Sequence, residues 1–413
     1  MKTKKIYLRF LGTLLLFSWN SIGQTANQGV LTNVGVSGSL GEINNLASGT
    51  LTNDGDLYVY NHYNNDGIVT FTAGTTTGMT RMKGLFGFQN LSGANAMRWF
   101  NCEFDNALIQ PAFHLSNQVS VSGTADFFQG IVDNDDFGGL MIFENGANHV
   151  NVDDASFVDG FVRKNGNELF RFPIGDGNQF RYASISNPSN PSDAFTGKYF
   201  LEDSNPLYPH VNVDSNITLI DNAEYWSVEK TTGSSNIFLT LTWDEDTTPS
   251  AIYSAPFEEI HIVRWDVALN KWIDEGGIAD SFTKEVTTVI NPLTEYGIFT
   301  LARVRVVVPC SGETLVVKNL ISANEDSFND SLSIVGIEDC PNNKVEVYNR
   351  WGVKVYETTA YNSNGNVFKG YSQARATVSA DSKLPDGTYF YFVEVFDEST
   401  GATSKLSGFV FLN

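Results

Sequence analysis

Acidic residues gather in turn-like segments of the first half of the chain, where they could supply carboxylates for glycoside hydrolysis. The segment VDNDDF (132–137) contains Asp133, Asp135 and Asp136, and NVDDASF (151–157) is a similar acidic turn. A glycosidase needs two carboxyl groups at a defined separation, and spacing in sequence does not set that separation. These residues therefore support an alternative function only, that of a secreted polysaccharide-active enzyme with an acidic site on the N-terminal β-region.

A third acidic segment, NEDSFND (324–330), offers Asn324, Asp326 and Asp330 as oxygen ligands for Ca²⁺. It lacks the glycine turn and the distal bidentate Glu that complete an EF-hand loop, so we favour a loop capped by Asx turns. The five histidines are scattered without zinc-ligand spacing, and no nucleophile elbow, phosphate-binding loop or dinucleotide fingerprint is present. We predict no cofactor, apart from Ca²⁺ as an alternative at this loop, and no enzymatic activity.

Composition favours an exported all-β protein. The 413 residues carry a formal net charge of −21 without a Lys/Arg-rich stripe, which argues against a nucleic-acid partner. Abundant glycine and Asn/Asp-Gly turns between short apolar runs indicate short strands. At the N-terminus the cationic start MKTKKIYLR, the apolar run FLGTLLLFSW and the small residues SIG predict a signal peptide at residues 1–23. That run is too short to span a bilayer, and no later segment approaches 18 apolar residues.

The chain divides into four segments after the signal peptide. Residues 24–160 place strand-like runs every 8–12 residues between Asn/Asp/Gly turns, which suits a β-solenoid or a β-sandwich, and few hairpin pairs favour the solenoid. Residues 161–203 read as a connector. Residues 204–305 resemble an immunoglobulin-like β-sandwich, whose core four tryptophans would fill or cap, and residues 306–413 read as a small C-terminal β-sandwich.

Three cysteines are present, so at least one is unpaired in an exported chain. Cys310 and Cys340 lie in the same C-terminal unit and are the candidate disulfide. Cys102 lies in the aromatic run RWFNCEF and is expected to be a buried thiol.

Two motifs of the C-terminal unit combine turn residues with large aromatics. In VYNRWGVKVYE (347–357), Gly352 permits the positive φ of a tight turn, Trp351 is expected to pack, and Arg350 can stack on it or on a neighbouring Tyr. In LPDGTYFYFVEV (384–395), Pro385 and Gly387 suit a turn, and both faces of the following strand are apolar, so a second sheet or a partner must cover the extra face. The candidate docking residues are Asn349, Arg350, Trp351, Gly352, Leu384, Pro385, Gly387, Thr388 and Tyr389.

The order of these motifs resembles the gliding-motility-associated C-terminal domain, the type B sorting domain of the type IX secretion system in Bacteroidetes surface proteins. The resemblance covers roughly the last 95 residues and departs from the family pattern at Ala323, where Pro is usual, at Glu325, where Gly is common, and in the long insert YSQARATVSADSK. The matching residues are Ser322, Asn324, Asp326, Asn329 and Asp330 in a loop, Asn349 to Gly352 in a turn, Phe368 and Gly370, and Leu384 to Tyr391.

The resemblance implies that the C-terminal domain is read by the type IX translocon and by an outer-membrane β-barrel protein that anchors it. On this basis we predict a non-enzymatic, adhesin-like protein of the type IX secretion and gliding apparatus, delivered to the cell surface or secreted. Surface glycans and other adhesin components are the further partners considered. The sequence is compatible with either a passenger or a permanent component of the translocon.

Overall fold

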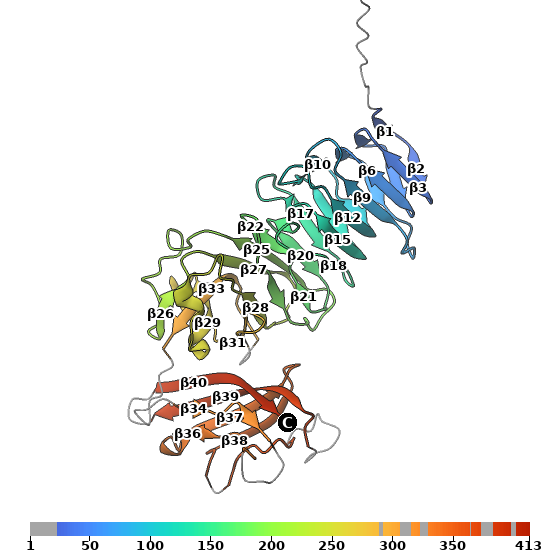
Figure 1. Ribbon diagram of the computed structural model, residues 1–413. Helices are drawn as coiled ribbons and strands as arrows, with labels where there is room; N and C mark the ends of the chain where they lie inside the picture. The colour runs from blue at the N-terminus through green and yellow to red at the C-terminus, as the bar shows by residue number, and fades with distance from the viewer. Residues whose placement is uncertain are drawn as a thin grey trace, which may run out of the picture.

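The computed structural model describes residues 23–288, 292–305, 315–322, 329–363, 365–372, 383–397 and 402–413. Figure 1 shows an elongated all-β protein, in which a parallel solenoid leads into a two-sheet sandwich and a smaller β-domain follows. The prediction of an all-β chain with an N-terminal solenoid is confirmed, and the alternative of an N-terminal sandwich is wrong, because the pairing there is parallel from coil to coil. The predicted signal peptide lies outside the described residues except for Gly23.

Each of the first six coils of the solenoid contributes one short strand to each of three parallel sheets. The first sheet contains β1 (Thr25–Asn27), β4 (Ile43–Asn45), β7 (Tyr63–Asn65), β10 (Gln89–Ser92), β13 (Phe113–Leu115), β16 (Val132–Asp133), β19 (Val158–Asp159) and β22 (Ile174–Asp176), and ends with β23 (Gln179–Phe180). The second contains β2 (Val30–Asn33), β5 (Thr50–Asn53), β8 (Ile68–Thr70), β11 (Met97–Trp99), β14 (Gln118–Val121), β17 (Leu140–Phe143) and β20 (Val162–Asn165). The third contains β3 (Val36–Ser39), β6 (Asp56–Val59), β9 (Met79–Lys83), β12 (Asn101–Asp105), β15 (Thr124–Gln129) and β18 (Asn148–Val150).

Asparagine side chains at the strand ends join successive coils. The amide nitrogen of Asn27 donates to Asn45 Oδ1 at 2.8 Å, and that of Asn45 donates to Asn65 Oδ1 at 2.8 Å. The same side chains also hold the following turns, since Asn65 Oδ1 accepts from the backbone N–H of Gly67 at 3.2 Å. The Asn-rich turns of the sequence are therefore rungs of buried ladders that fix the register between coils.

The solenoid runs into the sandwich without a break in the core. Strand β20 pairs in antiparallel fashion with β25 (Ala194–Phe200), and the hydrophobic core is continuous from Ile43 to Leu301. Residues 161–203, expected as a connector, contain β20 to β25 and belong to both units. The turn residues in this stretch resemble a linker in sequence, but Phe172 and Phe195 between them are fully buried, and a linker would leave them in water.

The sandwich packs an antiparallel extension of the second solenoid sheet against a separate five-stranded sheet. The extension contains β25, β27 (Tyr225–Thr232), β33 (Gly297–Val304), β29 (Ile260–Asp266) and β30 (Lys271–Asp274), with β26 (Ile217–Ile220) beside β33. The opposing sheet contains β21 (Phe170–Arg171), β24 (Ala183–Ile185), β28 (Leu239–Thr242), β32 (Glu285–Thr287) and β31 (Ile278–Asp280). Two short helices, α1 (Ser250–Tyr253) and η1 (Phe257–Glu259), precede β29. The sandwich thus draws strands from before residue 204, the boundary expected from sequence.

The C-terminal domain has a hydrophobic core of its own. A five-stranded sheet follows the order β35 (Leu320–Ile321), β40 (Ala402–Leu412), β39 (Gly387–Asp397), β37 (Asn343–Asn349) and β38 (Lys354–Thr359). A two-stranded sheet contains β34 (Val316–Val317) and β36 (Ile334–Val335), and the short helix η2 (Ile337–Asp339) follows it. The described part of the chain contains no helix with the length and apolar character needed to cross a membrane.

Candidate functional site

The turn between β37 and β38 is built around one asparagine and one glycine. Asn349 Oδ1 accepts hydrogen bonds from the backbone N–H groups of Trp351 and Val353, both at 3.0 Å, and the Asn349 carbonyl accepts from Gly352 N–H at 3.0 Å. Gly352 has φ of 72°, a left-handed conformation that a side chain disfavours. Asn349 and Gly352 therefore shape the turn.

The other two residues of the turn, Arg350 and Trp351, are exposed at the surface and do not pack into the core. Trp351 is 73% exposed, which corrects the expectation that it packs into the domain. The Arg350 guanidinium lies 4.6 Å from the centre of the Trp351 indole, so the expected cation–π stacking is present. The cause is the tight turn itself, which points its central residues away from the sheet. The pair presents a flat apolar ring and a positive charge on one exposed corner of the domain.

The LPDGTY motif anchors the start of β39. Leu384 is buried and its N–H donates to the Gly370 carbonyl at 2.9 Å, while the Tyr389 hydroxyl donates to the Pro385 carbonyl at 2.8 Å. Gly387 has φ of 147°, and Thr388 is exposed. Leu384, Pro385, Gly387 and Tyr389 therefore hold the turn and the core in place, and Thr388 faces outward beside Phe411 of β40.

One face of this sheet covers the domain core, and the opposite face meets the sandwich. Ser407 Oγ of β40 donates to the Gly277 carbonyl of the sandwich at 3.4 Å, and a small cleft between the two units is lined by Phe257, Ala279, Tyr391 and Phe409, among others. On β39, Phe392 is only 5% exposed and packs edge-on against Tyr348 of β37, and Figure 1 shows β40 as the strand nearest the sandwich. The extra apolar face expected from sequence is thus partly covered within the chain itself.

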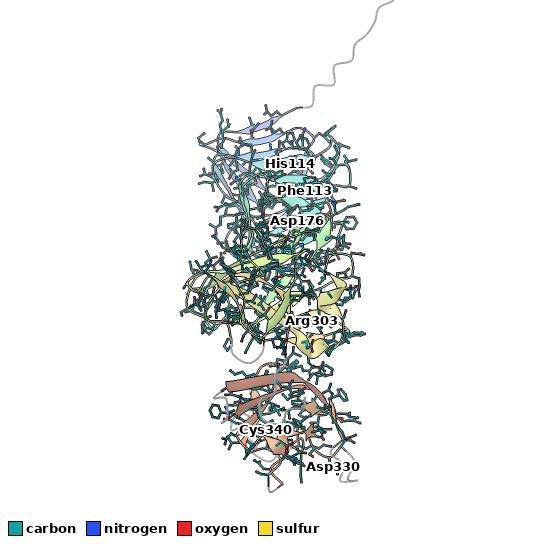
Figure 2. All side chains as sticks on the ribbon, turned by 90° about the vertical axis from the view of Figure 1, so that its left-hand side faces the viewer. Phe113, His114, Asp176, Arg303, Asp330 and Cys340 are labelled. Atoms are coloured by element: carbon teal, nitrogen blue, oxygen red, sulfur yellow. The ribbon has the colours of Figure 1, made fainter. Side chains whose placement is uncertain are left out.

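The candidate Ca²⁺ loop is described only in part. Asn324 and Asp326 lie outside the described residues, and Asp330 is located in the C-terminal domain together with Cys340 (Figure 2). Among the residues that the structure describes, no group of three or more His, Cys, Asp or Glu side chains is arranged to hold a metal ion.

The cysteines occupy two different settings. Cys340 takes part in a disulfide bond, and its proposed partner Cys310 lies outside the described residues. Cys102 is a buried free thiol, as expected, and burial raises its pKa far above the ordinary value, which leaves it protonated and unreactive.

The solenoid brings together acidic residues that lie on different coils. Asp133 and Asp159 are directly opposite each other in neighbouring strands β16 and β19, and His114 is in register with Asp133 on the other side. Asp135 forms an ion pair with Lys198 of β25, and Asp133 Oδ1 accepts from the Asp136 N–H at 3.1 Å. Of the three acidic residues selected from the sequence, Asp135 and Asp133 therefore have ion-pair or hydrogen-bond partners within the protein. Asp159 was not predicted from the sequence.

Aromatic rings stack along the same face of the solenoid. The ring centres of His62 and Phe88 are 5.8 Å apart, those of Phe88 and His114 are 4.4 Å apart, and those of His114 and Phe137 are 4.1 Å apart. Phe88 and Phe137 are each about two-fifths exposed. This row runs along the solenoid and ends near the carboxylates, so one surface offers both apolar ring edges and polar acceptors. This row of rings was not predicted from the sequence, because its four members come from separate coils.

Asp159 should make the stability of the protein depend on pH. Burial, together with the nearby carboxylates of Asp176, Asp133 and Asp135, raises the pKa of Asp159 from 3.8 to about 7. Between these two values the folded chain keeps a proton that the unfolded chain has lost, so stability falls as pH rises through this window. Asp159→Asn should therefore raise the melting temperature by at least ~2 °C more at pH 8 than at pH 4.5. The exposed neighbour change Asp136→Asn is the control, and an equal shift for Asp159→Asn at both pH values would contradict the assignment.

Comparison with protein families supports the reading of the C-terminal domain. Residues 315–412 match the family described as the CHU_C type IX secretion signal domain, within the range 306–413 predicted from the motifs. No curated protein matches the chain. The matched range contains the Asn349–Gly352 turn and the strands β34 to β40 that were described above. The chain therefore carries a C-terminal type IX secretion signal domain, and it is an exported cargo of that system.

Proposed function

We propose that this protein is a non-enzymatic, adhesin-like surface protein, whose solenoid and sandwich form the passenger and whose C-terminal domain directs export and surface retention. The observation that carries the proposal is the separation of the cores. The sorting domain has its own hydrophobic core, whereas the solenoid and the sandwich share another. A signal with an independent core can be read by the secretion machinery while a long, continuous passenger is presented to the outside.

The exposed turn of the sorting domain is the surface that we assign to its partners. Arg350 and Trp351 form an exposed cationic and aromatic corner, and rings of this kind are frequent anchors at protein interfaces. Gly352 beside them lies against Phe238 of the sandwich, so the opposite side of the turn is the accessible one. We assign the type IX translocon and an outer-membrane β-barrel anchor to this corner.

Truncation after residue 305 tests the proposal. The truncated chain keeps the continuous core of solenoid and sandwich, so it should fold, resist protease and accumulate in the periplasm. Surface exposure is measured by antibody labelling of intact cells, with Arg350→Ala/Trp351→Ala in the full chain as a finer variant that leaves the domain core intact. Surface delivery of the truncated chain at the level of the full chain would contradict the proposal.

A second candidate function is that of a polysaccharide-active enzyme on the solenoid. The observation in its favour is the pairing of Asp133 and Asp159 beside the row of stacked rings, since the raised pKa of Asp159 suits a general acid. Release of reducing ends from a polysaccharide by the wild-type protein, and its loss in Asp159→Asn, would favour this candidate over the non-enzymatic one.

A further inference from the structure

The first coil of the solenoid leaves all three of its sheets with an open edge. Within the described residues β1, β2 and β3 each pair on one side only, with β4, β5 and β6. In the second coil the N–H groups of Thr50 and Asp54 donate back to the carbonyls of Gly29 and Asn33. The equivalent N–H groups of the first coil, those of Val30 and Val34, have no such acceptor among the described residues. Edges of this kind are templates for pairing with another chain.

The side chains of the first coil also differ from those of the next. Val34 and Val36 are 78% and 77% exposed, at positions where the second coil has Asp54 and Asp56. Leu31 is 42% exposed, whereas Leu51, its partner in register, is 2% exposed. A terminal coil of a solenoid normally carries a polar cap, and here the cap is replaced by apolar side chains. These exposed apolar side chains at the end of the solenoid are typical of a surface that another chain covers.

At the opposite end of the solenoid, two of the three sheets are covered. Strand β20 pairs with the antiparallel strand β25, and β22 pairs with β23, while β18 of the third sheet pairs with β15 alone among the described residues. A second chain cannot stack head to tail on that end, because the sandwich occupies it. The open coil can meet only another open coil, which restricts the pairing of two copies to a closed, two-fold arrangement.

We propose that the first coil pairs head to head with the first coil of a second copy of this chain. Three strand edges around one solenoid axis require a partner with three edges in the same arrangement, and a second copy provides them. In a two-fold pair, the facing strands of the two first coils run antiparallel, and antiparallel strands pair favourably. The Oδ1 atoms of Asn27 and Asn33 accept the backbone N–H groups of Gly29 and Gly35, and the pairing also covers the side of each that a preceding coil would occupy.

The shape of the chain indicates that this pairing joins two cells, an inference that rests on the proposed surface location. Figures 1 and 2 show the first coil and the sorting domain at opposite ends of the molecule. In a head-to-head pair the two sorting domains therefore lie at the two far ends. Copies anchored on two cells would meet through their solenoid tips, and a small interface of this kind gains strength from many copies on facing surfaces.

The pairing is tested in solution with the purified full chain. Sedimentation equilibrium should show a monomer–dimer equilibrium, and Val34→Lys/Val36→Lys should weaken it at least about ten-fold through like charges at the contact. The matched control is Val211→Lys/Val267→Lys, since these valines are 87% and 84% exposed and lie in the sandwich. A wild-type monomer at every concentration, or equal dimerisation of the two double variants, would overturn the proposal.

The contact between cells is tested separately, by the clumping of cells that display the chain. Cells that display the wild-type chain should clump, and cells that display Val34→Lys/Val36→Lys at the same level should not. Displayed wild-type chain without clumping would overturn the contact between cells. If the chain is not retained at the surface at all, the proposed function fails, and the equilibrium in solution still decides the pairing of the first coils.

Discussion

Replacing Arg181 by methionine should lower the free energy of unfolding by about 3–5 kcal/mol, because it leaves a buried carboxylate without its cation. Arg181 is 7% exposed, and its Nε donates to Thr247 Oγ1 at 2.9 Å and lies 4.0 Å from Glu224 Oε2. Glu224 is fully buried and accepts hydrogen bonds from the hydroxyls of Tyr199, at 2.6 Å, and Thr248. Methionine keeps an unbranched apolar stem as far as the Nε position of arginine, so the loss reports the charge and the hydrogen bonds together with the volume of the guanidinium end.

The effect of Arg181→Met should grow with pH. Burial raises the pKa of Glu224 even with the arginine present, and loss of the cation raises it further. A group with a raised pKa destabilises the folded chain as pH rises above its unfolded value, so the variant should lose more stability at pH 8 than at pH 5. Urea unfolding at both pH values measures this. Arg171→Met is the control, because that side chain is half exposed and its ion pair with Glu285 is worth only about 1 kcal/mol. Similar losses for the two variants would refute the buried ion pair.

The sequence predicted best those features that depend on local turn chemistry. Asn349 and Gly352 shape one turn through hydrogen bonds within five residues, so their types and order identify the sorting domain without any knowledge of its packing. The Asn-rich turns indicated the solenoid for the same reason, since each Asn both caps its own turn and reaches the next coil. Exposure of Trp351 was not predictable, because it depends on the direction in which the turn projects from the sheet.

Features that depend on distant residues escaped the sequence analysis. The carboxylate of Glu224 is balanced by Arg181, which follows β23, and by Tyr199 of β25, and the three residues have no recognisable spacing in sequence. The pKa of Asp159 is raised by burial and by acidic residues on two other strands and a loop, and only the coil-to-coil register brings these together. The connector expected at 161–203 was missed in the same way, because its buried aromatics face two units at once. Such sites are set by register and packing, and these follow from the whole fold.

Asn45→Asp should destabilise the solenoid by about 3 kcal/mol or more, because it places a charge inside an amide ladder. Asn45 is fully buried, and its amide donates to Asn65 Oδ1 at 2.8 Å and to the Ile68 carbonyl at 3.0 Å. A carboxylate cannot donate, so both acceptors would face a negative oxygen at the same distance. Thermal unfolding at pH 7 measures the loss, and it should shrink as the pH falls toward 4, where the new carboxyl takes up a proton. The control is Asn44→Asp, the neighbouring position on the same strand, whose side chain faces outward and should change stability by less than about 0.5 kcal/mol. Equal effects at positions 44 and 45 would show that charge alone, and not the ladder, sets the cost.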